Sequence, residues 1–340
     1  MPPLPSPRGA TSAFLIDALR RAPHALRPPA PPRAAADPLA DDDLQLALYL
    51  CYELHYRGLD GVDERWEWEP SLLAVRRDLE ARFEVALEEA VPPASRGALP
   101  APEEMDVALR AIADADDGPS LSRHLEREGT LDHLREFCVH RSAYQLKEAD
   151  PHSWALPRLG GPPKAAMVEI QADEYGGGRA ERIHAELFAR AMRALGLDDA
   201  YGAYLDQIPG VTLATVNLMS LAGLHRRRRG AIVGHLALFE MTSSVPNRRY
   251  ANALRRLGLG EDATAFFDEH VVADAVHENV AAVDLAGGLV RQQPELCADV
   301  LWGARALVTL EARWAAHLLG AWAAGRSSLR PPPQEAAAAA

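Results

Sequence analysis

Three side chains between residues 266 and 280 have the types and the spacing of a metal-binding helix. His270, Asp274 and His277 are separated by four and then three residues, with no proline or glycine between them. At about 3.6 residues per turn they share one face of a helix. The residues between them are mainly apolar, so this face is expected to point into the protein, where two imidazoles and a carboxylate need a partner.

A bound transition metal would provide that partner. Imidazole and carboxylate are ligands that iron, manganese and zinc accept, and a cation offsets the cost of removing the Asp274 charge from water. The alternative is a solvated helix face that carries two histidines by chance. We favour the metal, because exposed helix faces in this chain carry Arg, Glu and Asp, as in Glu181–Arg190.

Three further polar residues lie in apolar, helix-forming surroundings and could complete such a site. Glu240 is an isolated charge in the apolar segment IVGHLALFEM, and His184 lies in ERIHAELF. Glu174 precedes the glycines Gly176–Gly178, where another helix or a ligand could approach the backbone closely. Six ligands on three helices could hold two metal ions with a carboxylate between them, as in di-iron sites of helical bundles.

One position in this set has a competitor. Glu181 precedes His184 by three residues and could coordinate from the same helix, whereas Glu174 precedes it by ten. A break in the helix near Gly176–Gly178 would favour Glu174, and a straight helix would favour Glu181. We prefer Glu174, because the sequence around Glu181 indicates a solvated face.

The ordered set resembles the haem-oxygenase-like di-iron oxidases and oxygenases, also described as iron-containing redox enzymes. The family pattern is a Glu and a His on one core helix, a single Glu on a second, and H-x3-D-x2-H on a third. The residues that match it are Glu174, His184, Glu240, His270, Asp274 and His277. The likeness covers roughly residues 141–323, and the segments YELHYRG at 52–58 and HRSAYQLKEADPHSWALPRL at 140–159 are also similar to this family.

The resemblance implies an all-α, haem-oxygenase-like helical bundle with two iron ions, no haem and O2 as co-substrate. The implied activity is that of a non-haem di-iron oxidoreductase that oxidises a small amine or amino-acid-like metabolite by N-oxygenation, with an external electron donor. Within the same class, the alternative is oxidative C–C cleavage, decarboxylation or desaturation of an amino or fatty acid. The alternative from another class is a non-catalytic or metal-independent member of the scaffold that acts as a binding protein.

A polar segment between residues 144 and 158 could contact the substrate, and Tyr144 and Arg158 are the residues expected to do so. The alternative for this segment is a salt-bridged surface loop. Its other polar residues are Lys147, Glu148, Asp150 and His152. His235 lies about one turn before Glu240 and is predicted to pack in the core or support a ligand without coordinating the metal. Glu311 does not share a helix face with His317 and is predicted to be structural.

Helices must position all these residues, because no segment alternates β-branched and polar residues as a strand does. Residues 1–40 are rich in Pro, Ala and Arg and are predicted to form a disordered or loosely docked arm, although Thr11–Leu19 could form a short helix. A helical N-terminal region at 41–118 could build a homodimer interface. The di-iron core is predicted at 119–325 and a disordered tail at 326–340.

The composition sets the remaining limits. A chain of 340 residues with 48% apolar residues can bury a large core. Cys51, Cys138 and Cys297 lie far apart and are predicted to be reduced. The formal net charge of −12 argues against nucleic acid as a partner. There is neither an apolar run for a membrane span nor a secretory signal in MPPLPSPRGA, so we expect a cytoplasmic protein.

Overall fold

The computed structural model describes residues 1–28, 36–93 and 99–332, except for the side chains of residues 274–276. Within these ranges the fold is all-α and contains no strand, which confirms the predicted class. The helices are α1 (Ala10–Leu19), α2 (Asp42–Glu53), α3 (Pro70–Ala90), α4 (Met105–Asp114), α5 (Leu121–Glu128), α6 (Leu131–Gln145), α7 (Asp150–Ser153), α8 (Gly161–Glu174), α9 (His184–Ala194), α10 (Gly210–Leu224), α11 (Arg229–Arg256), α12 (Glu261–Asn279), α13 (Gly288–Gln292) and α14 (Cys297–Ala323).

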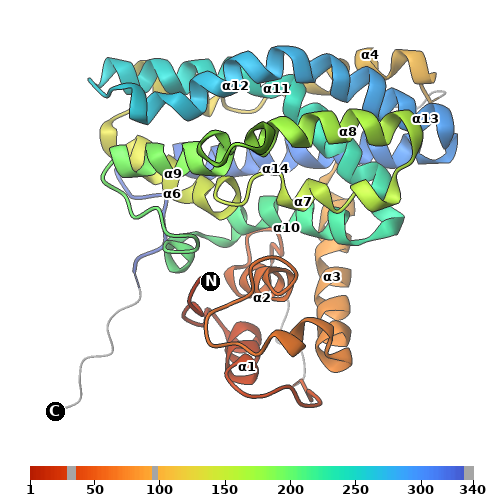
Figure 1. The fold of residues 1–340 in the computed structure, drawn as a ribbon. Coiled ribbons are helices and arrows are strands. Elements are labelled where there is room, and N and C mark those ends of the chain that lie inside the picture. Colours follow the sequence, from red (N-terminus) through yellow and green to blue (C-terminus); the bar gives the residue numbers. More distant parts are fainter. Residues whose placement is uncertain (29–35, 94–98, 333–340) are drawn as a thin grey trace.

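The long helices form a bundle, and the N-terminal helices cover one side of it (Figure 1). α11 packs against both α12 and α14, and α9 packs against α12. α12 continues into a π-helical segment, η8 (Val280–Gly287), which packs against α8. On the other side of the bundle, α10 packs against α2, with α1 and α3 beyond it.

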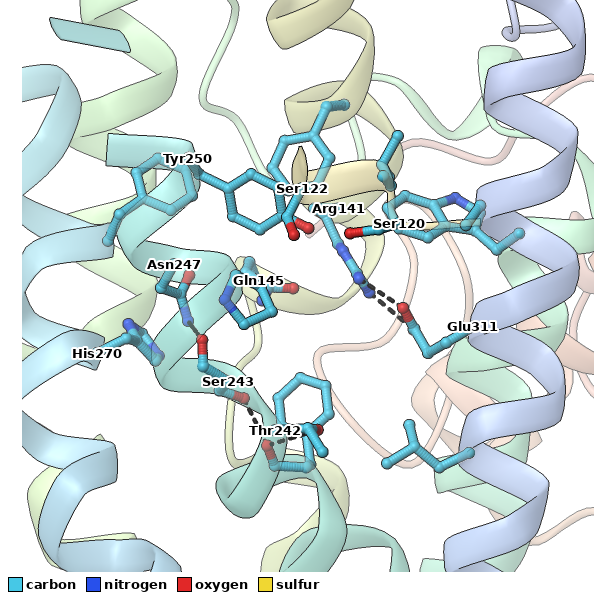
Figure 2. A pocket seen from close by; sticks show the side chains of 18 of the residues that line it. Ser120, Ser122, Arg141, Gln145, Thr242, Ser243, Asn247, Tyr250, His270 and Glu311 are labelled. Atoms are coloured by element: carbon cyan, nitrogen blue, oxygen red, sulfur yellow. Dashed lines mark hydrogen bonds and ion pairs between the residues drawn. The ribbon is translucent and has the colours of Figure 1, made fainter. Parts of the chain in front are cut away.

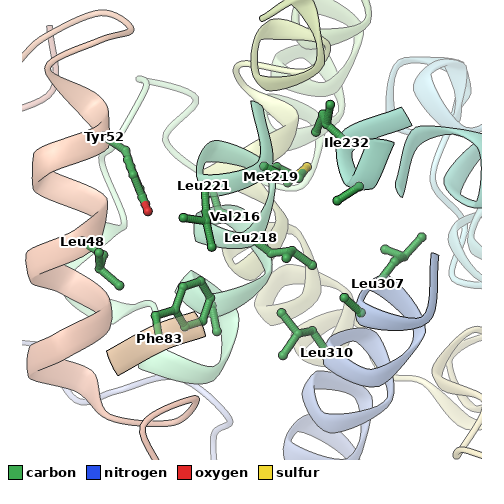
Figure 3. Close-up of a cluster of buried hydrophobic side chains, with 14 of the residues drawn as sticks. Leu48, Tyr52, Phe83, Val216, Leu218, Met219, Leu221, Ile232, Leu307 and Leu310 are labelled. Carbon is green, nitrogen blue, oxygen red and sulfur yellow. The ribbon is translucent and has the colours of Figure 1, made fainter. Parts of the chain in front are cut away.

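One hydrophobic cluster joins the N-terminal helices to the bundle. Leu48 on α2 and Phe83 on α3 belong to the same buried cluster as Leu218 on α10 and Leu307 on α14 (Figure 3). The core therefore continues across the predicted boundary at residues 118 and 119. That boundary and the homodimer interface stay predictions.

The structure differs from the disordered arm predicted for residues 1–40. Leu15 and Ile16 of α1 are buried, and α1 packs against α2. The carboxylate of Asp43 accepts hydrogen bonds from the backbone N–H groups of Thr11 and Ser12 at 2.9 and 2.7 Å, which satisfies the first turn of α1. The short helix predicted at Thr11–Leu19 is present as α1, and it docks through a few large apolar residues. Residues 29–35 lie outside the described part of the chain.

The first described residues of the predicted C-terminal tail are packed as well, which corrects that prediction up to residue 332. Ser328 is buried, and its backbone N–H and hydroxyl donate to Oε2 of Glu136 at 2.8 and 2.5 Å. The indole N–H of Trp322 donates to the same oxygen at 2.8 Å. One carboxylate oxygen on α6 therefore holds the end of α14 and the segment that follows it. Residues 333–340 lie outside the described ranges.

This arrangement makes stability depend on pH through Glu136. Burial raises the pKa of Glu136, but hydrogen bonds from Ser327, Ser328 and Trp322 outweigh it, and the pKa lies below its usual value. A carboxyl group whose pKa is lower in the folded state than in the unfolded state stabilises the fold at any pH above its unfolded-state pKa. This stabilisation is lost as the pH falls through the folded-state pKa. We expect Glu136→Gln to destabilise the protein near neutral pH and to matter less near about pH 3. Urea unfolding across this range measures the difference, and a constant difference would contradict the assignment.

α11 and α14 approach each other closely at two glycines. A Cβ atom on Gly234 would overlap the carbonyl of Val300, and a Cβ atom on Gly303 would overlap the carbonyl of Ala231. Backbone atoms cannot move aside as a flexible side chain can. The two helices can therefore pack at this distance only with glycine at both positions.

We expect Gly303→Ala to destabilise the protein by about 1–3 kcal/mol or more, because it overpacks this contact. Gly320 lies on the same helix, and no described atom lies within 4 Å of a Cβ atom placed there. Gly320→Ala is the matched control and should be neutral or stabilising by up to about 1 kcal/mol, since alanine is the better helix former. Urea unfolding of both variants tests the contact, and equal effects would contradict it.

Candidate metal centre

Six buried side chains converge between the helices of the bundle. They come from the turn after α6, from the adjoining ends of α8 and α9, from α11, and from α12. These residues are Glu148, Glu174, His184, Glu240, His270 and His277.

Four of them form one cluster. Glu148, Glu174, His184 and His270 each offer one ligand atom, and these atoms all lie within 4.8 Å of one another. Nδ1 of His184 is 2.9 Å from Oε2 of Glu174, and Nε2 of His270 is 3.5 Å from Oε1 of Glu148. Two carboxylates and two imidazoles at this spacing can surround a single cation.

A second cluster lies beside the first and shares one residue with it. Glu174, Glu240 and His277 offer ligand atoms within 4.8 Å of one another. Nδ1 of His277 is 3.4 Å from Oε2 of Glu240, and its Nε2 is 3.2 Å from Oδ2 of Asp173. A carboxylate on the far nitrogen is the usual way to orient a ligating imidazole. Glu174, the only residue common to both clusters among the described residues, is placed where a carboxylate could bridge two ions.

Several ligand atoms lack the partners that burial normally requires. Nδ1 of His184, Nδ1 of His277 and Oε2 of Glu148 have no hydrogen-bond partner among the described residues. Nδ1 of His184 is close to Glu174, yet the two groups are not aligned for a hydrogen bond. Unpaired buried polar atoms are costly, whereas a cation between them would accept their lone pairs. The donor set therefore fits a bound metal.

His270 is oriented by its own helix. Its Nδ1 lies 2.8 Å from the backbone carbonyl of Phe266, one turn earlier on α12. A carbonyl can only accept, so this contact favours the tautomer with the proton on Nδ1. Nε2, which lies 3.5 Å from Oε1 of Glu148, is then the nitrogen that could coordinate a cation.

Burial and charge act in opposite directions on the pKa values of the site. Burial lowers the pKa of His184, but the Glu174 carboxylate outweighs it and the pKa is raised. Burial also lowers the pKa of His277, but the nearby Glu240 carboxylate outweighs burial, and the pKa lies above its usual value. Burial raises the pKa of Glu240, and the opposing interaction with His277 does not offset this increase. The imidazoles and carboxylates thus stabilise each other's charges within the core.

The comparison with protein families identifies the class of protein. The family described as iron-containing redox enzymes matches residues 135–312, just over half of the chain. The chain belongs to this family. The matched span contains all six buried ligand candidates, and it supports an iron-containing oxidoreductase built on a haem-oxygenase-like bundle. No curated protein matches the chain. In the described ranges, no helix is long and apolar enough to cross a membrane.

In this iron-containing redox enzyme, the helix break near the glycines brings Glu174 and not Glu181 to the cluster. α8 ends at Glu174, and α9 begins at His184 after the short turns η4 (Gly176–Gly178) and η5 (Ala180–Arg182). Gly176 and Gly177 have φ angles of 69° and 58°, a region that favours glycine. A Cβ atom on Gly176 would also overlap the backbone of Arg182. Glu181 is exposed on η5.

The structure adds one ligand candidate to the predicted set, and it does not describe the side chain of another. Glu148 was predicted only as part of a polar segment that could contact the substrate, yet it lies in the first cluster. The sequence spacing could have indicated this position, because Arg141, Gln145 and Glu148 repeat the four-then-three separation of His270, Asp274 and His277. The side chain of Asp274 lies outside the described residues, so its role as a ligand stays a prediction.

The other predicted site residues have different surroundings. Tyr144 is buried, and its ring lies edge-on to those of His152 and Phe239 near the ligands. Both Nη atoms of Arg158 donate to the carbonyls of residues 223 and 224, at the end of α10. Arg158 therefore caps a helix and is not among the described residues that line the cavity. His235 is buried, and its Nδ1 lies 3.1 Å from Nε2 of His152.

A cavity of about 240 Å³ adjoins the first cluster. Glu148 and His270 form part of its wall, together with aromatic side chains such as Phe188 and Phe266. Figure 2 shows polar side chains projecting into the same space from the surrounding helices. A small molecule bound there would lie against two of the ligand candidates.

Proposed function

We propose that this protein is an O2-dependent di-iron oxidase or oxygenase that acts on a small amine or amino-acid-like metabolite by N-oxygenation. The observation that carries the proposal is that Glu174 belongs to both buried clusters. Two ions with a shared carboxylate are the arrangement of carboxylate-bridged di-iron proteins built on helical bundles.

The proposed ligands divide between two positions. Glu148, His184 and His270 would hold the first ion, while Glu240 and His277 would hold the second, and Glu174 would contact both. Asp274 is proposed as a further ligand from the spacing on α12. Bound iron would supply the redox chemistry that couples O2 reduction to oxidation of an organic substrate. The proposal includes an external electron donor and a homodimer, and no haem.

The chain's own residues would bind the substrate and shape its surroundings. Gln145 Nε2 lies 3.5 Å from Oε1 of Glu148 and can donate to it, which orients that carboxylate. Phe188, Phe239 and Phe266 line the cavity beside the ligands and limit the water that reaches them. The modest volume and mixed polar and apolar lining suit a small metabolite better than a long fatty acid.

Anaerobic Fe(II) titration followed by exposure to O2 tests the proposal, with optical and Mössbauer spectroscopy as the readouts. We expect the parent protein to bind close to two ions per chain and to show a coupled pair of irons after oxidation. His270→Ala and Glu240→Ala should each lose iron. His225→Ala is the control, because this imidazole pairs with Glu80 outside the clusters. Parent binding far below two ions, or ligand variants that bind as the parent does, would refute the di-iron assignment.

A further inference from the structure

The cavity beside the first cluster contains a pair of opposite charges. Arg141 on α6 donates two hydrogen bonds to Glu311 on α14, from Nη1 to Oε1 at 2.9 Å and from Nη2 to Oε2 at 2.6 Å. Both residues line the cavity, and their side chains are 16% and 26% exposed. Figure 2 shows this pair on one side of the cavity and His270 on the other. The sequence-based prediction of a purely structural Glu311 did not anticipate this position.

The guanidinium group is held rigidly in this place. Its central carbon lies 4.0 Å from the centre of the Trp314 ring and 5.9 Å from that of Phe137. Stacking on aromatic rings and a two-point contact with a carboxylate both fix the plane of the guanidinium. Arg141 therefore offers a preorganised site for a planar anionic group.

An unpaired acceptor lies between the ion pair and the metal ligands. Oε1 of Gln145 has no hydrogen-bond partner among the described residues, although the side chain is only 8% exposed. Gln145 lines the same cavity and follows Arg141 by one helical turn. A buried acceptor without a partner is costly, and an N–H donor from a bound molecule would satisfy it.

We propose that Arg141, Glu311 and Gln145 form the recognition site for the charged end of a zwitterionic substrate, an α-amino acid. The carboxylate of the substrate binds Arg141 through two hydrogen bonds, and its ammonium group binds Glu311 and Oε1 of Gln145. This inference rests on the proposed function, because that function places a substrate in the cavity. It adds the chemical class of the substrate and the residues that select it.

The paired charges explain why a zwitterion is selected over a singly charged molecule. An amino acid that inserts between Arg141 and Glu311 gives each of them a new partner of opposite charge. A simple carboxylate would take Arg141 and leave Glu311 without its partner, and a simple amine would do the reverse. An uncompensated charge in a partly buried site is unfavourable, so it acts against both of these competitors.

The same geometry determines which end of the amino acid faces the metal ligands. Glu148 lies in the turn that follows α6, three residues after Gln145, and lines the cavity together with His270. With its carboxylate and ammonium groups at Arg141 and Glu311, the amino acid extends its side chain toward Glu148 and His270. The side chain is then the part of the substrate that lies beside the proposed iron.

Calorimetric titration of the full-length protein under anaerobic conditions, with and without Fe(II), tests this inference. The probes are the proteinogenic L-amino acids at millimolar concentration, followed by the amine and the carboxylic acid that match the tightest binder. We expect at least one amino acid to bind at least tenfold more tightly than either of its matched analogues. Binding by none of them, or equal binding of the three matched compounds, would overturn the inference.

Two variants and a control separate recognition from a structural role. Arg141→Gln and Glu311→Gln should each weaken amino-acid binding at least tenfold, and Glu311→Gln preserves the shape of the side chain. Arg76→Gln is the control, because Arg76 and Glu80 form an ion pair of similar burial, 15% and 4% exposed, outside the cavity. It should leave binding unchanged. Parent-like binding by Glu311→Gln would show that the pair only joins α6 to α14.

The iron titration distinguishes failure of this inference from failure of the proposed function. Two irons per chain without amino-acid binding would overturn the inference alone. Selective amino-acid binding by a protein that fails to bind iron in the titration would overturn the di-iron function and leave the recognition site in place.

Discussion

Replacing Glu174 with alanine is expected to abolish high-affinity iron binding at both positions. The carboxylate of Glu174 lies 2.9 Å from Nδ1 of His184 and also belongs to the cluster of Glu240 and His277. Loss of a group that merely supports a ligand typically weakens metal binding about 10- to 100-fold, so loss of a shared ligand should cost at least about 100-fold at each position. Fe(II) titration followed by metal analysis measures the effect.

Two comparison variants make this prediction specific. Glu181→Ala removes an exposed carboxylate seven residues further along the chain and should bind iron as the parent does. Glu240→Ala removes a carboxylate found in the second cluster alone, so binding should fall to close to one ion per chain. Should Glu174→Ala still bind one ion tightly, Glu174 would not be a shared ligand. Loss of iron in Glu181→Ala would show that this carboxylate coordinates instead.

Replacing Lys147 with alanine is expected to lower the free energy of unfolding by about 3–5 kcal/mol, the cost of leaving a buried charge unpaired. Nζ of Lys147 lies 2.9 Å from Oε2 of Glu53, and the two side chains are 1% and 0% exposed. The ammonium group also lies 4.8 and 4.2 Å from the ring centres of Tyr49 and Tyr56. Without it, the buried Glu53 carboxylate would have no opposite charge within 4.0 Å among the described residues, although it would keep the hydroxyl of Tyr201, which donates at 2.7 Å. Urea unfolding measures this loss.

An exposed pair provides the control for the buried one. Asp63 pairs with Arg65, which is 76% exposed, and water screens such a pair strongly, so Arg65→Ala should change stability little. The double variant Glu53→Leu/Lys147→Met removes both buried charges and should recover much of the stability lost in Lys147→Ala. A loss below about 1 kcal/mol in Lys147→Ala would contradict the assigned role of the pair.

The buried pair also connects the N-terminal helices to the metal centre. Glu53 lies on α2, and Lys147 directly precedes the ligand candidate Glu148. Because the two residues are adjacent in the chain, we expect a shift of Lys147 to displace the Glu148 carboxylate. We therefore expect Lys147→Ala to weaken iron binding at the first position more than at the second, which Fe(II) titration of the folded variant can measure.

Local sequence was sufficient for the features that depend on helix periodicity and on backbone freedom. The spacing of His270 and His277 predicted one inward face of a helix, and the structure buries both side chains. The glycines at 176–178 marked the place where a helix break would favour Glu174 over Glu181, because these residues permit positive φ angles that other residues avoid. An isolated charge in an apolar helix, such as Glu240, indicated a buried polar site, because burying a charge without a partner is costly.

Only the tertiary structure decided which of these faces meet. Glu148 joins His270 from a distant part of the sequence, and Arg141 pairs with Glu311 in the wall of the cavity. The close packing of α1 against α2 was likewise not predicted, because composition averages over the few apolar side chains that make this contact. Periodicity specifies the buried side of a helix, whereas the partner of that side depends on contacts between residues far apart in the chain. Close approaches such as that of Gly234 to Val300 set those contacts, and no local pattern reports them.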